Sequence, residues 1–167
     1  MIGMQAPTGT GTRPSIAHTW GSTPAERLRP FPCDRFLPGA DDARFRAVDV
    51  AAPAPVIFRW LCQLRAAPHS YDWLDTPGRR RPRRLIPGLG RLTRGQRVMT
   101  IFELAAFEPD RHLRLVMALP RAIRRFGHVA VSYVLVPQGG ARCRLVAKLL
   151  VRYPSRDPGR RLRPLFP

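Results

Sequence analysis

The chain has 167 residues, of which 44% are hydrophobic, so it suits one domain with a true core and is not disordered by composition. Its formal net charge of +18 suggests a nucleic-acid or anionic-membrane partner. However, arginine supplies nearly all of that charge and Lys148 is the single lysine, a pattern that a GC-rich genome produces whatever the function. No apolar run approaches the roughly 20 residues that span a bilayer. No secretory signal pattern precedes His18, so we expect a cytoplasmic protein with no membrane span.

The three cysteines, Cys33, Cys62 and Cys143, lie far apart and form neither a CxxC pair nor a cluster with histidine. An odd number of dispersed cysteines indicates free thiols rather than a disulfide framework or a structural zinc site. The glycine-rich nucleotide motifs GxxxxGK and GxGxxG are also missing from the sequence. We therefore expect neither a metal nor a cofactor.

The N-terminal part of the chain divides at Trp20. Residues 1–19 are rich in Pro, Gly, Thr and Ser, and we expect a disordered tail there. Residues 20–43 are Pro-rich but carry Trp20, Phe31 and Phe36 as apolar anchors, which predicts an arm packed on the domain formed by residues 44–167. Within the arm, the pair Thr23–Pro24 has the cap and first-turn chemistry of a short helix.

The domain is expected to begin with a strand over Arg44–Val50. A helix should follow from Pro53 or Pro55 to Leu64, because proline fits a first helical turn. Arg59 and Gln63 occupy the polar face of this helix. Its apolar stripe, at three-to-four spacing, comprises Val56, Ile57, Trp60, Leu61 and Leu64.

An irregular stretch after this helix carries rings and then arginines. His69, Tyr71 and Trp73 either cover the core as a packed connector or form the rim of a ligand pocket. The basic run Arg79–Arg84 could bind phosphates. It has no interleaved aromatic residues and no recognisable helix, which favours a solvated loop and argues against nucleic-acid binding.

The second half of the chain has the pattern of strands joined by tight turns, at Arg97–Phe107, His112–Leu119, His128–Val136 and Arg142–Tyr153. Pro120–Gly127 is expected as a basic connection. The last two strands flank a Pro- and Gly-containing loop and should form an antiparallel hairpin. Consecutive antiparallel strands with one helix predict an α+β domain, a curved antiparallel β-sheet with one or two covering helices.

The alternation is clearest in the final strand, and it predicts one core-facing side and one water-facing side. The polar side carries Arg142, Arg144, Lys148 and Arg152, interrupted by Val146 and Leu150. The apolar side carries Cys143, Leu145, Ala147, Leu149, Val151 and Tyr153.

Together these elements resemble the SRPBCC superfamily of START/Bet v 1-like helix-grip domains, in its polyketide-cyclase/dehydrase-like branch. The resemblance covers roughly Trp20 to Tyr153 and rests on the order of many short motifs. The motifs are Trp20–Pro24 with Pro32–Asp34, Phe45–Val50, Ala52–Leu61, Tyr71–Trp73, Gly95–Val98, Phe107–Leu113 and Tyr133–Pro137 through Arg144–Val146.

The resemblance implies a sheet wrapped around a long C-terminal helix, with an apolar cavity between them that binds lipids, sterols or polyketides. Some members of the superfamily catalyse ring closure or dehydration. This chain departs from the pattern, because Asp157–Arg163 leaves room for only about two helical turns. The C-terminal helix is therefore expected to be truncated. The apolar side of the last strand should then either be open to a partner or second copy, or be covered by the Trp20–Phe36 arm.

The residues that could do chemistry are few. The weak catalytic candidates are Glu103, His128 and Tyr133; Glu103 is expected to face water or an arginine rather than the core. His69 and His112 could also act as bases, but spacing fixes no partner for either. Ser70, Ser132 and Cys62 have no nucleophile-elbow context.

The sequence thus favours binding of a small hydrophobic ligand, as a carrier or sensor, between sheet and helix. A polyketide cyclase/dehydratase-type enzyme is the first alternative, and nucleic-acid or acidic-partner binding through arginine clusters is the second. A homodimer through an uncovered sheet face is also possible on this basis. The residues expected to line the cavity, or else to be plain core, are Trp60, Tyr71, Trp73, Leu115, Met117, Tyr133, Leu149 and Val151.

Overall fold

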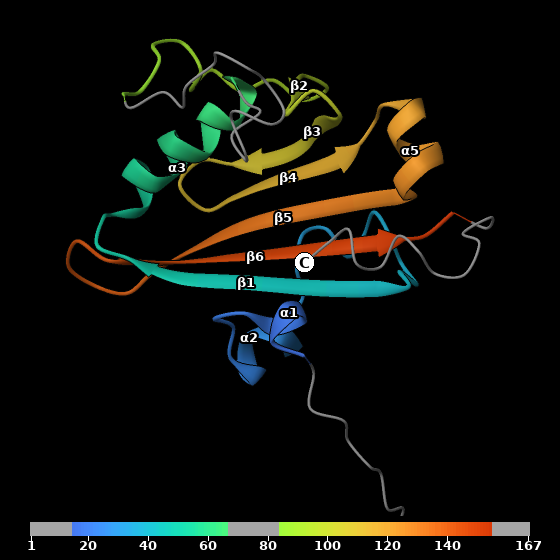
Figure 1. The fold of residues 1–167 in the computed structure, drawn as a ribbon. Helices are drawn as coiled ribbons and strands as arrows, with labels where there is room; N and C mark the ends of the chain where they lie inside the picture. The colour runs from blue at the N-terminus through green and yellow to red at the C-terminus, as the bar shows by residue number, and fades with distance from the viewer. Residues whose placement is uncertain (1–14, 67–83, 155–167) are drawn as a thin grey trace, which may run out of the picture.

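The computed structural model describes residues 15–66 and 84–154. Within them a curved antiparallel sheet carries helices at two ends of one face, so the predicted α+β class is confirmed (Figure 1). The helices are α1 Ile16–Thr19, α2 Pro24–Leu28, α3 Ala54–Cys62 with a 3₁₀ turn Gln63–Ala66, and α5 Pro120–Phe126. The strands, in the sheet order β1-β6-β5-β4-β3-β2, are β1 Asp42–Val50, β6 Cys143–Arg152, β5 His128–Pro137, β4 His112–Met117, β3 Phe102–Glu108 and β2 Arg97–Val98.

The predicted hairpin between the last two strands is confirmed. β5 pairs with β6 along its whole length, and Tyr133 lies opposite Ala147. The first strand, β1, pairs antiparallel with the other edge of β6, and Arg46 lies opposite the same Ala147. β6 is therefore an inner strand, flanked by β1 and β5. Side chains on its two faces pack into two different cores.

One face of the sheet, which we call the concave face, packs against α3 and α5. Val151 of β6 is fully buried there, together with side chains of both helices. Most of the main core lies on this face: Ile57, Phe58 and Leu61 from α3, Ala122 from α5, and Leu104, Leu113, Leu115, Val129 and Val131 from the sheet.

The N-terminal arm covers the opposite, convex face, where a second core forms. Phe31, Cys33 and Leu37 of the arm pack on Phe45 and Ala47 of β1, with Val146 and Leu150 of β6. Of the two alternatives for the side of Leu149 and Val151, the one in which the arm covers it is therefore wrong. Val146 and Leu150, which interrupt the polar side of β6 in sequence, are the residues that the arm buries.

Ion pairs hold the arm to the polar positions of β6. Arg144 binds Glu26 of α2 at 2.8 Å, and the Lys148 ammonium lies 2.6 Å from an Asp34 carboxylate oxygen. The predicted helix start at Thr23–Pro24 is confirmed, with a full capping box in which the Thr23 and Glu26 side chains each bond the other's backbone N–H. Glu26 and Asp34 of the arm therefore each meet a cation of the sheet.

The buried face of α3 is rotated slightly from the predicted stripe. Phe58 and Cys62 are buried, whereas Trp60 is 43% exposed and Gln63, expected on the polar face, is 4% exposed. The Gln63 side-chain oxygen accepts a hydrogen bond from the Ile86 N–H at 2.9 Å. This bond satisfies the buried amide, which explains how a polar residue is tolerated there.

Two further expectations are corrected by the backbone. The long strand over Arg97–Phe107 is broken into β2 and β3, because Met99 and Thr100 have left-handed backbone angles, φ 48° and 63°. The connection Pro120–Gly127 contains a helix, α5, that begins with Pro120 in its first turn. Helix α1 also lies inside the range expected to be a disordered tail.

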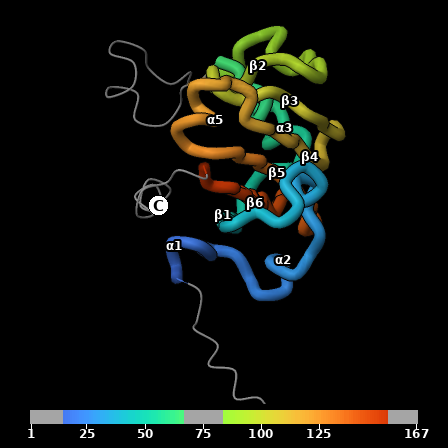
Figure 2. The backbone as a smooth tube through the Cα atoms, turned by 90° about the vertical axis from the view of Figure 1, so that its right-hand side faces the viewer, coloured from blue at the N-terminus to red at the C-terminus, as the bar shows by residue number. Residues whose placement is uncertain are grey.

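Several predicted features lie outside the described residues: His69, Ser70, Tyr71, Trp73, the arginines from 79 to 83 and the chain after Pro154. Figure 2, turned by 90°, shows α1 and α2 beyond the β1 edge of the sheet. Among the described helices, none is both long and apolar enough to cross a bilayer.

Candidate functional site

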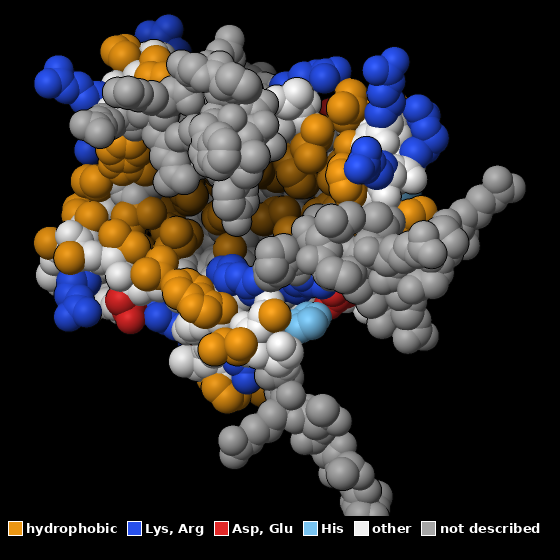
Figure 3. Space-filling model, viewed as in Figure 1, with side chains coloured by type: hydrophobic (Ala, Val, Ile, Leu, Met, Phe, Trp, Pro, Cys, Tyr) orange, Lys and Arg blue, Asp and Glu red, His pale blue; other side chains and the backbone are white. Residues whose placement is uncertain are grey.

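The concave face is hollowed between α3 and α5. Figure 3 shows hydrophobic side chains gathered in this hollow, which is bordered below by the β1 edge. On β6, Leu145, Ala147 and Leu149 point to this face and are only partly buried, although β6 is an inner strand. Their neighbours Val146 and Leu150, on the convex face, are 3% and 5% exposed. The floor of the hollow is therefore accessible apolar surface, which a closed core would not leave.

Tyr133 is the polar group of this floor. Its side chain packs against the main core and lies between Leu113 of β4 and Ala147 of β6 in the sheet register. Tyr133 is half-buried, and within the described residues its hydroxyl has no hydrogen-bond partner. Burial raises the pKa of Tyr133 above its ordinary value of 10.0, so the hydroxyl keeps its proton and is available as a donor.

The β1 border of the hollow is charged. Arg44, 6% exposed, points to the concave face, because Phe45 and Ala47 point to the other. The Arg44 Nε binds Asp42 at 3.0 Å, and the Tyr153 hydroxyl donates to the same Asp42 oxygen at 3.0 Å. Burial opposes ionisation of Asp42, but the Arg44 and Tyr153 hydrogen bonds outweigh it, and the pKa of Asp42 is lowered. Figure 3 shows basic side chains along this border, with an acidic side chain and a histidine beside them.

The predicted lining residues divide into floor, core and surface. Tyr133 and Leu149 lie on the floor. Leu115, Met117 and Val151 belong to the main core and are buried. Trp60 lies exposed on α3. Tyr71 and Trp73 are outside the described part of the chain.

The three catalytic candidates do not come together. Tyr133 faces the hollow, whereas Glu103 lies opposite Val116 and Arg97, with a side-chain parity that places it on the convex side. His128 is exposed at the start of β5, opposite Arg152. No group of three His, Cys, Asp or Glu side chains suited to a metal ion occurs within the described residues.

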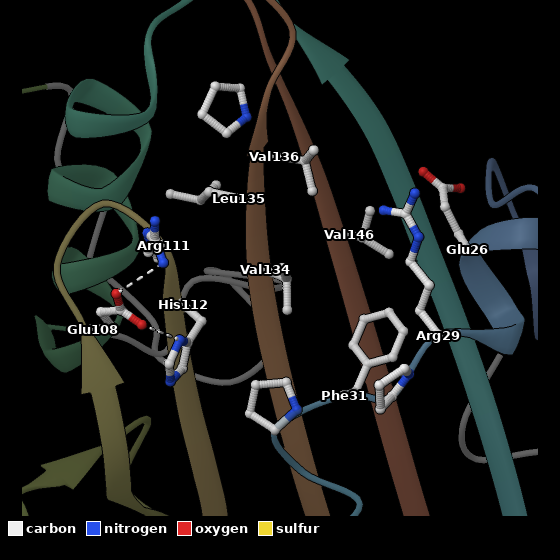
Figure 4. A pocket seen from close by; sticks show the side chains of 13 residues that line it. Glu26, Arg29, Phe31, Glu108, Arg111, His112, Val134, Leu135, Val136 and Val146 are labelled. Atoms are coloured by element: carbon white, nitrogen blue, oxygen red, sulfur yellow. Dashed lines mark ion pairs between the residues drawn. The ribbon is translucent and has the colours of Figure 1, made fainter.

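A second concavity lies on the convex face, between the arm and the β3–β4 turn. Figure 4 shows this cleft, with Val134 and Val146 beneath it, Arg29 and Phe31 on one side, and His112 on the other. Its volume is about 470 Å³. Burial is the main cause that lowers the pKa of His112, and Glu108, 3.6 Å from its Nδ1, opposes that shift.

The acids of this convex cleft are already paired. Glu108 also meets Arg111 at 3.3 Å, and Glu26 is held by Arg144. The sequence did not single out Glu26, Arg29 or Glu108 as lining residues. The four-residue spacing of Glu108 and His112 across a tight turn was the one local signal, because such a turn brings the strand ends together.

Comparisons with known proteins add little to this geometry. No protein-family model and no curated protein matches the sequence. A solution structure of an Arabidopsis thaliana member of the major latex protein family is 16% identical with a TM-score of 0.40, over 66% of this chain and 76% of that one. A solution structure of a Thermobifida fusca protein is 16% identical with a TM-score of 0.44, over 68% and 75%. Likeness at this level assigns neither family nor function.

Proposed function

We propose that the concave face binds a small hydrophobic molecule, such as a lipid or a polyketide, and that the protein acts as a carrier or sensor of it. The observation that carries the proposal is the accessible apolar floor of Leu145, Ala147 and Leu149 on an inner strand. Two helices and the sheet enclose this floor on several sides, which is the concave, mostly apolar form that ligand sites take.

Binding would be driven by removal of apolar surface from water. Each 100 Å² of apolar surface covered contributes roughly 2.5 kcal/mol. The Tyr133 hydroxyl supplies a donor at the floor, which would orient a ligand that carries an acceptor. The convex cleft is less suited to this role, because paired charges such as Glu108 and Arg111 line it.

A pair of cavity-filling variants tests the proposal. Ala147→Trp fills the hollow, whereas Val136→Trp places the same ring in the convex cleft that Val136 lines. Titration with Nile red, an uncharged apolar dye, should show saturable binding to the full chain. We expect Ala147→Trp to weaken dye binding by at least about tenfold, and Val136→Trp to change it by less than about twofold.

The reverse ranking of these two variants would place the ligand in the convex cleft and overturn the proposal. Absence of saturable dye binding to the parent chain would overturn it as well. Circular dichroism of both variants provides the check that each retains the parent's secondary structure.

A cyclase- or dehydratase-type reaction is the second candidate function, and Tyr133 is the observation that favours it. A protonated hydroxyl at the floor of an apolar hollow can donate a hydrogen bond that stabilises a developing oxyanion. Tyr133→Phe would then abolish conversion of a poly-β-keto substrate while the dye still binds. Equal conversion rates for Tyr133→Phe and the parent would remove this candidate.

A further inference from the structure

A second hollow on the convex face, which we call the cationic pocket, adjoins the convex cleft. The two share Pro30–Pro32 of the arm and His112 as lining, and the volume of the cationic pocket is about 420 Å³. Arg35 of the arm and Arg114 of β4 complete its lining, and no acid is among the described residues that line it. The pocket therefore has apolar walls and a charge of one sign.

Arg114 is a partly buried guanidinium without an anionic partner. Its Nη1 donates to the Pro32 carbonyl at 2.7 Å, and its Cζ lies 4.0 Å from the centroid of the Phe36 ring. Its Nε is buried and has no hydrogen-bond partner in the described part of the chain. A partly buried charge that is held by one neutral carbonyl keeps unsatisfied donors, and an anion would satisfy them.

The charges nearest to Arg114 have the same sign as its own. Burial is the main cause that lowers the pKa of Arg114, and the positive charges of Arg35 and Arg94 lower it further. Arg35 is exposed, and within residues 15–66 and 84–154 its side chain has no ion pair and no hydrogen bond. Two guanidinium groups without an anion thus meet at one pocket.

The neighbouring carboxylates already have partners. Asp34 of the arm binds the Lys148 ammonium at 2.6 Å. Glu108 lies 3.3 Å from Arg111 and 3.6 Å from His112, and Figure 4 shows both of these ion pairs. Neither acid forms an ion pair with an arginine of the cationic pocket, so the protein itself leaves that charge uncompensated.

We propose that the cationic pocket binds the phosphate group of a small soluble phosphate monoester, between Arg35 and Arg114, with the organic part of the ligand against Pro30–Pro32. A phosphate monoester carries about −1.5 to −2 charges near neutral pH, which matches two unpaired guanidinium groups. Guanidinium groups also fit phosphate oxygens with pairs of parallel hydrogen bonds. This site lies on the face opposite to the concave hollow, so the proposal goes beyond the hydrophobic-ligand site and does not depend on it.

Three probes of similar shape test the proposal on the full chain: phenyl phosphate, phenyl sulfate and phenol. At about pH 7.5 the phosphate is mostly a dianion, the sulfate is a monoanion and phenol is uncharged. Amide NMR titrations at constant ionic strength measure each Kd and locate the site, with shifts expected at Arg35 and His112. We expect phenyl phosphate to bind at least about tenfold more tightly than phenyl sulfate, and phenol not to saturate. Equal affinity for phosphate and sulfate, or no saturable binding of phenyl phosphate, would overturn the proposal.

Three variants assign the binding to this pocket. Arg35→Gln and Arg114→Gln each remove one guanidinium and should weaken phenyl phosphate binding by at least about fivefold. Because Arg35 is exposed, Arg35→Gln keeps the test valid where Arg114→Gln disturbs folding. Arg142→Gln removes an equal charge from an exposed position in the hairpin loop, and it should change the affinity by less than about twofold. Unchanged affinity in both pocket variants, or an equal loss in all three, would contradict the site.

A lipid headgroup presents the same phosphate monoester at a membrane surface, and vesicles separate the two sources. The parent, Arg114→Gln and Arg142→Gln are co-sedimented with phosphatidylcholine vesicles that contain phosphatidic acid. We expect Arg114→Gln to sediment as the parent does, because the Arg114 Nε is buried in the protein. Loss of sedimentation in Arg114→Gln but not in Arg142→Gln would assign the site to a lipid headgroup and overturn the soluble ligand. Nile red binding tests the concave face separately, so failure of one site is distinguished from failure of the other.

Discussion

Leu149 and Leu150 are consecutive residues of β6, yet their side chains meet different environments. Leu150 is 5% exposed beneath the N-terminal arm, and Leu149 lies partly exposed on the floor of the concave hollow. The better-buried residue is the one that interrupts the polar side of the strand. On the apolar side of β6, Leu145, Ala147 and Leu149 stay partly exposed, although Cys143 and Val151 at the two ends are fully buried.

This difference predicts that the same substitution has different effects on stability and on dye binding at the two positions. Leu150→Ala should lower the free energy of unfolding by about 2–4 kcal/mol, because it leaves a cavity under the arm. Leu149→Ala should lower it by less than about 1.5 kcal/mol, because the site is already open. Leu149→Ala should weaken Nile red binding, whereas Leu150→Ala should not. Urea unfolding and dye titration measure the two effects, and equal destabilisation by both variants would contradict the assignment of faces.

The ion pair between Glu26 and Arg144 predicts an acid-sensitive arm. The Arg144 hydrogen bond is the main cause that lowers the pKa of Glu26 from 4.5 to about 2. Because the folded pKa lies below the unfolded one, the contribution to stability is present above pH 4.5 and is lost as pH falls toward 2. Glu26→Gln should cost about 1–2 kcal/mol near neutral pH and much less at the acid end of this window.

Glu108→Gln is the matched control for this ion pair. Glu108 is about half exposed, at 48%, and its bonds to Arg111 and His112 are longer. Its loss should change the free energy of unfolding by less than about 0.5 kcal/mol. If Glu26→Gln and Glu108→Gln behave alike at every pH, the structural role given to Glu26 is wrong.

The raised pKa of Tyr133 predicts that the protein loses stability at alkaline pH. Its folded pKa is raised by burial above the ordinary 10.0, so the neutral side chain is favoured in the folded state. Its contribution is fully present below pH 10.0 and is lost as pH rises through that value toward the folded pKa. Tyr133→Phe should therefore lose less stability than the parent between about pH 9 and about pH 11 in urea titrations. Parallel losses in the two proteins would show that the Tyr133 hydroxyl is solvated.

The backbone at Gly127, at the end of α5, is expected to accept only glycine. It has φ 84°, and a Cβ at this position would lie 2.0 Å from the Arg152 carbonyl oxygen. Gly127→Ala should lower the free energy of unfolding by more than about 3 kcal/mol, since it combines strain with a backbone clash. Gly139→Ala, at φ 81° with no atom within 4 Å, should cost only about 1–2 kcal/mol. Similar costs at the two glycines would contradict the close contact between α5 and the end of β6.

The local alternation of the chain predicted the sheet well. β5 and β6 pair as expected, and β1, α3 and β4 lie close to their predicted ranges, because each shows its period within a few residues. The break between β2 and β3 was not predicted. Met99 and Thr100 form a left-handed turn there, and neither is a glycine or proline that would mark such a turn in the sequence. The helix α5 was not predicted, because a proline, three arginines and a following glycine, Gly127, are typical of a connecting loop.

The sequence did not indicate which face of the sheet the arm covers, and the cause is long-range pairing. Arg144 and Lys148 looked solvent-facing, but their partners Glu26 and Asp34 lie 118 and 114 residues away in sequence. Tyr133 and Leu149 could be chosen from alternation alone. Arg44 and Arg46 could not, because only the register of β1 on β6 shows that they border the hollow.

Methyl-group NMR of the leucine and alanine side chains, with dodecanoic acid as the ligand, tests the central claim most directly. We expect intermolecular NOEs from the ligand's hydrocarbon chain to the methyl groups of Leu145, Ala147 and Leu149, and none to that of Leu150. NOEs to Leu150 or to Leu37 of the arm, without contacts to Leu149, would contradict binding on the concave face.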